Sequence, residues 1–302
     1  VAEGSLFDGR VFEDGSAVEL FVDSLKEKAG EIADRFFRSP SKDVDVIGVT
    51  GTNGKTSVAS YIANYLALGG VKSGVIGTLG YGLVQEPGQV FEATGHTTPS
   101  VVDVHRYLAV LRDQGAKCIV MEVSSHGLSQ GRVDGVRFEG AVFTNLSRDH
   151  LDYHGTMSAY AQAKKKLFQS EGLSFAVINQ EDNYAEIMLA DLEKSVTLVK
   201  YGIQIDADVS VCDYSLESDA GSALTANVKS PVGEMHISSA LIGRFSLSNL
   251  LAVISVAIAK KQTTHCASRI NQLEPVQGRM EVLKVSGKPK VVIDYAHTPD
   301  AL

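Results

Sequence analysis

Hydrophobic residues along the chain follow two patterns in turn. The run at residues 44–50 is continuous and rich in β-branched side chains, which predicts a buried strand. After a glycine-rich turn, Val58, Ile62 and Leu66 recur at helical spacing until the glycine pair at 69–70. The first 70 residues therefore end in a strand, a tight turn and an amphipathic helix.

The same alternation continues over most of the chain. We expect strands at 73–78, 117–123, 140–146 and 174–179, and helices at 100–115, 156–170 and 246–261. Ser100 is the expected N-cap of the first of these helices. Strands that alternate with helices predict an α/β fold, a doubly wound and mostly parallel sheet.

Between about Asp206 and Gly243 the pattern changes. Residues 223–228 and 234–241 alternate between apolar and polar side chains, and the turn-like sequence SPVG at 230–233 separates them. This predicts small antiparallel ribbons appended to the parallel sheet.

Composition narrows the class of protein. The chain has 302 residues, of which 44% are hydrophobic, so it can form more than one core and roughly two domains. Its formal net charge is −8, and the sequence contains no stripe of lysine or arginine residues. Because binding to a phosphate backbone requires such basic clusters, we expect no nucleic-acid partner.

The cysteines and the ends of the chain bear on its location. Cys118, Cys212 and Cys266 are odd in number and widely spaced, which predicts neither a disulfide framework nor a zinc site and favours the cytoplasm. No apolar run approaches the ~20 residues of a membrane helix, so we expect no membrane contact. The chain starts at Val1 and stops soon after the strand-like run at 290–295, so we expect both ends to be cut and this last strand to be unpaired.

The sequence GVTGTNGKT at 48–56 is the strongest chemical signal. In a phosphate-binding loop, glycines let backbone N–H groups approach the phosphates, a lysine reaches the terminal phosphates and a hydroxyl binds Mg²⁺. Lys55 and Thr56 match the last two roles, although Val49 occupies the position of the usual first glycine. Because a predicted strand precedes the loop and a helix follows it, we favour the phosphate loop over a structural turn with a solvated lysine.

Further polar stretches follow predicted strands, at 95–100, 121–132 and 143–155. Open α/β sheets bind their ligands at the carboxyl ends of the strands. Glu122 leaves such a strand and could bind Mg²⁺, or could instead serve as an N-cap or an ion-pair partner. His150 lies between Asp149 and Asp152, which fits a second cation site, a phosphate contact or an acidic helix N-terminus.

Lys164 lies on the apolar face of its predicted helix, together with Met157, Ala161 and Phe168, whereas Lys165 and Lys166 are expected to point away. Burial favours the neutral amine of a lysine, which can add CO₂ and form a carbamate suited to Mg²⁺. The plainer alternative is a lysine whose stem packs while its ammonium group reaches the solvent.

Taken together, eight motifs resemble the Mur ligases of peptidoglycan synthesis, in particular the branch that adds the third amino acid to UDP-N-acetylmuramoyl-L-alanyl-D-glutamate. The motifs are GVTGTNGKT, HTTPS, MEVSSHGL, FTNLSRDHLDYHGTM, AKKKLF, GRFSLSNLLAV, QGRMEV and DYAHTPDAL. The resemblance implies three domains: the tail of an N-terminal UDP-binding domain at 1–40, a central ATP-binding ligase domain at 41–281, and the start of a C-terminal Rossmann-like domain at 282–302.

The resemblance also implies roles for single residues. Lys55, Glu122, His150 and Lys164 would be catalytic, and Thr56, Glu122, His150 and a carbamylated Lys164 would bind Mg²⁺. The residues implied at ATP are Gly51, Thr52, Asn53, Gly54, Lys55, Thr56, Ser57, Asn249, Arg279 and Asp294, with His297 nearby. Those implied at the muramoyl dipeptide are His96, where relatives often carry Asn, and Thr97, Thr98, Ser124, Gln130 and Arg132.

By this resemblance the protein is an ATP-dependent amide ligase that works through an acyl phosphate, as a monomer, on the UDP-linked dipeptide and a diamino acid. That amino acid is meso-diaminopimelate, toward which we lean, or L-lysine, and the motif that decides lies beyond residue 302. The alternatives are another enzyme of the superfamily, such as folylpolyglutamate synthase, and a nucleotide-binding fragment without ligase turnover.

Overall fold

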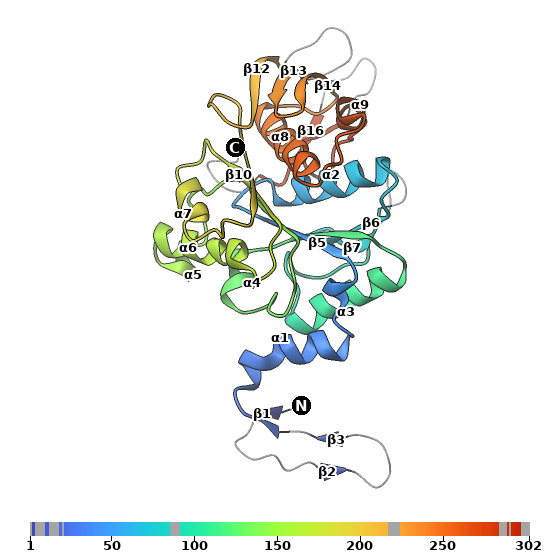
Figure 1. Ribbon diagram of the computed structural model, residues 1–302, viewed down its shortest axis with the longest axis vertical. Coiled ribbons are helices and arrows are strands. Elements are labelled where there is room, and N and C mark those ends of the chain that lie inside the picture. Colours follow the sequence, from blue (N-terminus) through green and yellow to red (C-terminus); the bar gives the residue numbers. More distant parts are fainter. Residues whose placement is uncertain are drawn as a thin grey trace.

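A large mixed sheet forms the centre of the molecule (Figure 1). The computed structural model describes residues 2–3, 10–11, 18–19, 21–84, 91–216, 224–283, 289 and 291–296. Within these residues the sheet has ten strands in the order β14-β13-β12-β11-β10-β9-β5-β8-β6-β7. Their bounds are β5 (Asp45–Thr50), β6 (Ser73–Gly77), β7 (Gly80–Leu83), β8 (Cys118–Glu122), β9 (Gly140–Phe143), β10 (Phe175–Asn179), β11 (Thr197–Gly202), β12 (Val209–Ser215), β13 (Leu224–Ser230) and β14 (Gly233–Ser239).

Seven strands that are neighbours in the sheet run parallel, namely β12, β11, β10, β9, β5, β8 and β6. The strands β7, at one edge, and β13 and β14, at the other, join antiparallel. A parallel strand is covered by helices on both faces, so it needs apolar residues throughout rather than in alternation. Accordingly, every residue of β8, β9 and β10 is buried, and so is every residue of β5 after Asp45.

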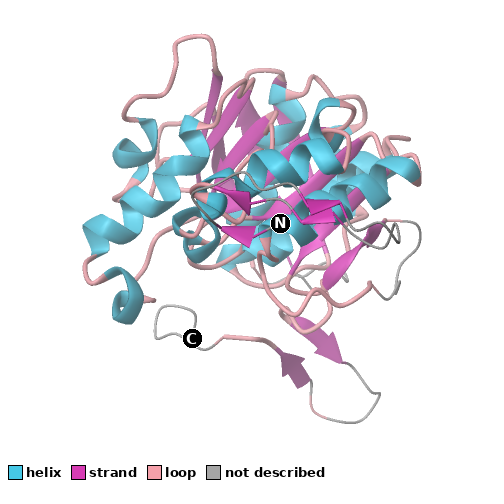
Figure 2. Ribbon diagram, turned by 90° about the horizontal axis from the view of Figure 1, so that it is seen from below, coloured by secondary structure: helices cyan, strands magenta, loops and turns pink. Residues whose placement is uncertain are grey.

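Helices cover both faces of the sheet, as Figure 2 shows. On one face, α2 and α8 pack over Ile47, Val120 and Val142; on the other, α3 and α6 pack over Val46, Met121 and Ala141. The helices are α1 (Leu25–Phe36), α2 (Lys55–Leu68), α3 (Val101–Asp113), α4 (Ser125–Ser129), α5 (Leu151–His154), α6 (Met157–Lys165), α7 (Ala185–Leu189), α8 (Arg244–Ala259) and α9 (Cys266–Asn271), with 3₁₀ turns η1 (Pro40–Lys42) and η2 (Lys166–Gln169).

Outside the central sheet, the described residues form short two-stranded pairs. Their strands are β1 (Ala2–Glu3) with β4 (Phe21–Val22), β2 (Arg10–Val11) with β3 (Val18–Glu19), and β15 (Glu281–Leu283) with β16 (Val291–Ile293). Figure 1 places the first two pairs below α1. None of the helices in the described part of the chain is both long and apolar enough to cross a membrane.

The predicted α/β fold is confirmed. The hydroxyl of Ser100 accepts a hydrogen bond from Asp103 N and caps α3, as expected. The predicted helix at 156–170 is α6 followed by a 3₁₀ turn, and the antiparallel ribbon is present as β12, β13 and β14. The hydrophobic pattern did not predict β7 or β11. The antiparallel strand β7 is at one edge of the sheet, and β11 lies between β10 and β12.

Two expectations were wrong. The last strand is not unpaired, because β16 pairs antiparallel with β15, an earlier segment of the chain, although its three residues remain 43–51% exposed. Lys165 does not point into solvent: its side chain is buried, and its Nζ lies 2.6 Å from Asp191 Oδ2, an ion pair that offsets the cost of burying the ammonium group.

An ion cluster joins α8 to the amino-terminal ends of the central strands. Lys260 follows α8, its side chain is 9% exposed, and its Nζ donates hydrogen bonds to Asp45 Oδ2, at 2.9 Å, and to Glu139 Oε2. Burial alone would lower the pKa of this ammonium group, but its bonds to Glu139 and Asp45 outweigh burial and raise the pKa above 10.5. The cluster therefore fixes the sheet at the end opposite to the phosphate loop.

Replacing Lys260 by methionine is expected to lower the free energy of unfolding by about 2–3 kcal/mol at pH 7, because the two carboxylates lose their partner. Since the pKa of Lys260 is raised on folding, its stabilisation is complete below pH 10.5 and is lost as the pH rises above that value. Urea unfolding at pH 7 and pH 11 should show that the difference in free energy of unfolding between wild type and Lys260→Met is smaller at the higher pH. Lys261→Met, at an exposed neighbour, is the control, and equal stability of Lys260→Met and wild type at pH 7 would exclude this role.

Candidate functional site

The loop at 51–54 joins the carboxyl end of β5 to the start of α2. Its backbone is fixed from outside, because Thr52 N and Asn53 N donate to the backbone and side-chain oxygens of Asn145, at 2.8 and 2.9 Å. Gly54 has a φ of +83°, and a Cβ there would lie 2.8 Å from Asn249 Oδ1. No side chain caps α2, so the N–H groups of its first turn are available to an anion.

Lys55 folds back along this loop. Its Nζ donates hydrogen bonds to the carbonyl oxygens of Gly51, at 2.9 Å, and Thr52, at 2.8 Å. Burial lowers the pKa of Lys55, and the nearby carboxylate of Glu122 partly opposes this shift. A phosphate bound at α2 could take over the bonds that Lys55 now makes to the loop.

Glu122 ends β8 and is only 2% exposed. Its Oε2 accepts from Thr56 Oγ1 at 2.9 Å and lies 3.2 Å from Thr78 Oγ1, while its Oε1 accepts from Thr78 N at 2.7 Å. Within the described residues this carboxylate forms no ion pair, and Ser124 rather than Glu122 caps α4. Among these residues Glu122 is therefore neither a helix N-cap nor an ion-pair partner. Its oxygens, together with the Thr56 hydroxyl, form a donor set that suits Mg²⁺.

Lys164 is buried, so the alternative in which its stem packs and its ammonium group reaches the solvent is excluded. Its side chain is 1% exposed, and its Nζ donates to Gly51 O at 2.7 Å and lies 4.6 Å from the centre of the Tyr160 ring. Burial lowers the pKa of Lys164 well below 10.5, and the charge of Lys55 lowers it further. Two lysine amines thus converge on one carbonyl oxygen, and desolvation favours the neutral form of the buried one.

His150 lies at the start of α5, on the rim of this site. Its side chain is 43% exposed, its Nε2 lies 3.4 Å from Asp149 Oδ2, and its ring centre lies 6.1 Å from that of Tyr160. Burial lowers the pKa of His150, which favours a neutral imidazole at pH 7. The structure therefore brings His150 to the same aromatic ring that contacts Lys164, and both the ligand and the helix-terminus interpretations remain open.

Of the residues expected at the dipeptide, Thr98 bonds to the backbone of Glu122, and the members of the set differ in exposure. Thr98 is buried: its hydroxyl donates to Glu122 O at 3.0 Å and accepts from Ser124 N at 2.9 Å. Arg132 donates to Thr98 O at 2.9 Å and to Gln130 Oε1 at 2.9 Å. Thr97 is partly exposed and His96 is exposed.

Two further expected residues, Arg279 and Asp294, lie near the end of the described chain, and Arg279 reaches the first turn of α2. Arg279 donates from Nη2 to Thr56 Oγ1 at 3.3 Å, and its guanidinium lies 4.6 Å from the ring centre of Tyr295. Both oxygens of Asp294 accept backbone N–H groups, from Met280 and Ala296. His297 lies outside the described residues.

Three further residues belong to this site and were not found from the sequence. Asn145 holds the loop, and Tyr160 binds Thr52 Oγ1 through its hydroxyl at 3.1 Å. Thr78 bonds to Glu122 through both its backbone and its side chain. A signal for Thr78 and Asn145 did exist, because each lies at the carboxyl end of a predicted strand, 73–78 or 140–146, where open α/β sheets bind ligands. Nothing in the helical pattern distinguished Tyr160 from a core residue.

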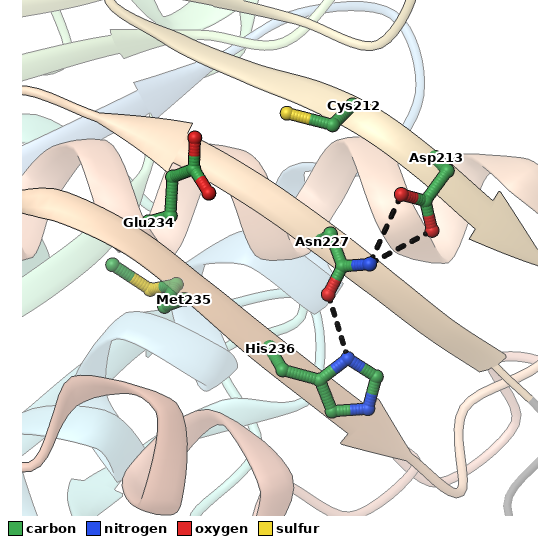
Figure 3. Close-up of a pocket in the computed structure, with 6 residues that line it drawn as sticks. All are labelled: Cys212, Asp213, Asn227, Glu234, Met235 and His236. Atoms are coloured by element: carbon green, nitrogen blue, oxygen red, sulfur yellow. Dashed lines mark hydrogen bonds between the residues drawn. The ribbon is translucent and has the colours of Figure 1, made fainter.

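A second hollow lies away from this site, on the exposed face of β12, β13 and β14, and has a volume of about 230 Å³ (Figure 3). There Asn227 Nδ2 donates to both carboxylate oxygens of Asp213, at 2.9 and 3.0 Å, and His236 Nδ1 donates to Asn227 Oδ1 at 2.9 Å. These polar groups satisfy one another within the sheet. The motif residues gather instead at the phosphate loop, which is therefore the candidate site.

The described residues hold no group of three or more His, Cys, Asp and Glu side chains that could bind a metal on its own. A divalent cation at Glu122 would therefore need further ligands, such as water or the oxygens of a bound phosphate. The hard oxygen donors of Thr56 and Glu122, next to an uncapped helix N-terminus, fit a cation bound together with a nucleotide.

A loop of this kind between a buried parallel strand and a helix, beside a buried carboxylate, is typical of a nucleotide-binding α/β domain. Residues 49–257 match the Mur ligase middle domain, and the chain belongs to the Mur ligase family. It is similar to the UDP-N-acetylmuramoyl-L-alanyl-D-glutamate–2,6-diaminopimelate ligase of Coxiella burnetii, with 45% identity over 93% of this chain and 57% of that protein. The chain thus spans a little over half the length of this relative.

Solved structures agree with this assignment. A UDP-N-acetylmuramoyl-L-alanyl-D-glutamate–2,6-diaminopimelate ligase matches with a TM-score of 0.78 and 34% identity, over 96% of this chain and 59% of that one. Folylpolyglutamate synthase of Mycobacterium tuberculosis, complexed with ADP and AMPPCP, matches with a TM-score of 0.71 at 18% identity, over 90% of this chain and 67% of that one. At this identity the second match shows the common fold alone.

Proposed function

We propose that this chain is the catalytic part of an ATP-dependent ligase that joins diaminopimelate to UDP-N-acetylmuramoyl-L-alanyl-D-glutamate. The observation that carries the proposal is the convergence of Lys55, Lys164 and the buried carboxylate of Glu122 at the first turn of α2. Diaminopimelate rather than lysine is supported by the names of the similar proteins, which are 2,6-diaminopimelate ligases.

The proposal divides the chain as the motifs do. Residues 1–40 end a UDP-binding domain, residues 41–281 form the ATP-binding domain, and residues 282–302 begin the domain that holds the amino acid. The partial match to longer relatives supports this division. The protein would act in the cytoplasm, which agrees with the free thiols of Cys118, Cys212 and Cys266, and as a monomer.

In the first step, the γ-carboxylate of D-glutamate attacks the γ-phosphorus of ATP, ADP leaves and an acyl phosphate forms. The N–H groups of residues 54–57 hold the phosphates, and the Lys55 ammonium group offsets charge on the γ-phosphoryl oxygens. For this, Lys55 exchanges its bonds to Gly51 O and Thr52 O for bonds to phosphate. Thr97, which bonds to Thr78, and Arg132, which bonds to Thr98 O, orient the dipeptide.

The implied cofactor is Mg²⁺, for which Thr56 and Glu122 supply one ligand set and His150 and Lys164 the second. When bound, Mg²⁺ supplies charge neutralisation for the phosphates. Lys164 would reach the charge state that a ligand requires by adding CO₂ to its neutral amine, with release of one proton. The burial of Lys164 and its position beside Tyr160 support this modification.

In the second step, an amine of diaminopimelate attacks the acyl carbon and phosphate leaves, so that an amide forms. The tetrahedral intermediate carries an oxyanion, and the N–H groups of α2 together with Lys55 lie on the side of the sheet where this charge develops. Arg279, which bonds to Thr56 Oγ1, adds a positive charge from the segment that leads to the third domain.

The competing function is a folylpolyglutamate synthase, which shares the fold. The 45% identity to the diaminopimelate ligase favours the peptidoglycan substrate, because the match to the synthase structure reaches only 18%. A nucleotide-binding fragment without turnover is the third possibility, since the chain spans 57% of the relative.

A substrate-dependence assay separates these functions. We expect the intact protein to release ADP only when Mg-ATP, the UDP-linked dipeptide and diaminopimelate are all present, with one amide product detected by mass spectrometry for each ADP. A folate with glutamate, and lysine in place of diaminopimelate, are the controls. ADP release with the folate would assign the alternative enzyme, and nucleotide binding without any product would assign the fragment.

A further inference from the structure

Thr78 occupies the turn between β6 and β7, at the carboxyl end of a strand next to β8. Gly77, just before the turn, lies so close to Glu122 that a Cβ there would be 2.2 Å from Glu122 Oε1 and would displace the carboxylate. Thr78 N donates to this same oxygen at 2.7 Å. The backbone of the turn is therefore fixed to the carboxylate.

The hydroxyl of Thr78 has two neighbours in different parts of the site. Its Oγ1 lies 3.2 Å from Glu122 Oε2, which also accepts from Thr56 Oγ1 at 2.9 Å. The same Oγ1 lies 3.0 Å from Thr97 Oγ1. Thr78 thus stands between the carboxylate at the phosphate loop and a threonine expected at the dipeptide.

Proton counting restricts this contact to two arrangements. A hydroxyl carries one proton and a carboxylate only accepts, so Thr78 donates either to Glu122 or to Thr97. If Thr78 donates to Glu122, then Thr97 must donate to Thr78 and can only accept from a ligand. If Thr78 donates to Thr97, the proton of Thr97 is free to bind an anionic ligand.

Binding of a cation to the Glu122 carboxylate would select between these two arrangements. An oxygen of Glu122 that is shared with a cation is a weaker acceptor for Thr78, which favours donation to Thr97. The Thr97 hydroxyl is then a donor, as the carboxylates of the dipeptide require.

On the basis of the proposed function, we infer that Thr78 is a positioning residue that couples binding at the Mg-nucleotide site to binding at the dipeptide site. The coupling is positive, because filling the Glu122 site turns Thr97 from an acceptor into a donor. By linkage, the dipeptide strengthens nucleotide binding by the same factor.

Calorimetry on the intact protein tests this coupling. The dissociation constant of the UDP-linked dipeptide is measured with and without saturating Mg-AMPPNP, and the wild type is expected to bind about tenfold more tightly with the nucleotide. In Thr78→Val, which keeps the backbone donor and the branched shape, the factor falls to within about twofold of unity. Thr78→Ser keeps the hydroxyl and restores the coupling.

Thr94→Val is the matched control. The Thr94 hydroxyl lies 2.8 Å from both Gly77 O and His96 O and can donate to either carbonyl oxygen, so it contacts the same turn without bonding to Glu122. We expect this variant to keep the coupling, which separates the proton arrangement from the stiffness of the turn. Thr97→Val removes the other hydroxyl and also abolishes the coupling, so the test does not depend on whether Thr78→Val folds.

The inference is overturned if Thr78→Val keeps the tenfold factor, if Thr78→Ser loses it, or if Thr94→Val loses it to the same extent as Thr78→Val. A wild type that binds both ligands without coupling overturns the inference and leaves the proposed function standing. A wild type that binds no Mg-AMPPNP overturns both.

Discussion

Lys164→Met is expected to lower the rate of ligation by about 10³-fold while the protein stays folded. Methionine fills a similar space among Tyr160 and the apolar residues of α6, but it cannot donate to Gly51 O or add CO₂. Because the variant also removes a buried amine, its stability at pH 7 should equal or exceed that of the wild type. Turnover and urea unfolding measured on the same preparation test both statements.

The modification itself has a separate signature. In buffer with ¹³C-labelled bicarbonate, the wild type should show a carbamate carbon signal by NMR that is missing in Lys164→Met. Lys166→Met, at the exposed lysine of the following turn, is the matched control and should keep both the signal and the turnover. A wild type without the signal, or a Lys164→Met variant with normal turnover, would show that Lys164 only packs.

Glu122→Gln is expected to lower turnover by about 10²- to 10³-fold. The substitution keeps the size of the side chain but replaces an oxygen that accepts hydrogen bonds with an NH₂ group that faces donors from Thr56 or Thr78. It also removes the negative charge that the proposed cation needs. Nucleotide binding should then require an at least tenfold higher Mg²⁺ concentration, measured by titration of Mg²⁺ at fixed AMPPNP.

A carboxylate-to-amide change at another position in the sheet is the control for Glu122→Gln. Asp182→Asn alters a half-buried carboxylate at the carboxyl end of the sheet, which accepts from Leu146 N at 2.7 Å. Burial raises the pKa of Asp182, so this variant should affect stability rather than the Mg²⁺ requirement. If Glu122→Gln and wild type need the same Mg²⁺ concentration, the carboxylate does not serve the cation.

Much of the fold could be predicted from the sequence because the signals are local. The apolar run before Thr50, the glycine turn and the helical spacing after Lys55 are contiguous, so they predicted β5, the loop and α2 directly. Residues at the ends of parallel strands were expected to gather at one edge, and Glu122 and Thr56 do so at 2.9 Å. The edge strands were harder to predict, since β7 holds two glycines in its four residues and has a weak hydrophobic pattern.

The rest of the site depends on contacts between residues far apart in the chain. Lys164 and Gly51 are 113 residues apart, and only the packing of α6 against the loop determines that the amine meets that carbonyl oxygen. Periodicity indicated that Lys164 was buried but also predicted solvent for Lys165, because the ion pair with Asp191 has no local signal. The pairing of β16 was missed for a different reason: it is local, since Leu283 pairs with Val291, but we looked for a partner only after β16 in the sequence.

The most direct test of the central claim is a crystal structure of this chain with Mg²⁺ and AMPPNP. We predict that the triphosphate lies at the first turn of α2, that Lys55 Nζ leaves Gly51 O for the γ-phosphate, and that a cation contacts Thr56 and Glu122. A triphosphate bound at the hollow on β12–β14, or a loop that stays empty at saturating nucleotide while Lys55 keeps its bonds to Gly51 and Thr52, would contradict the account.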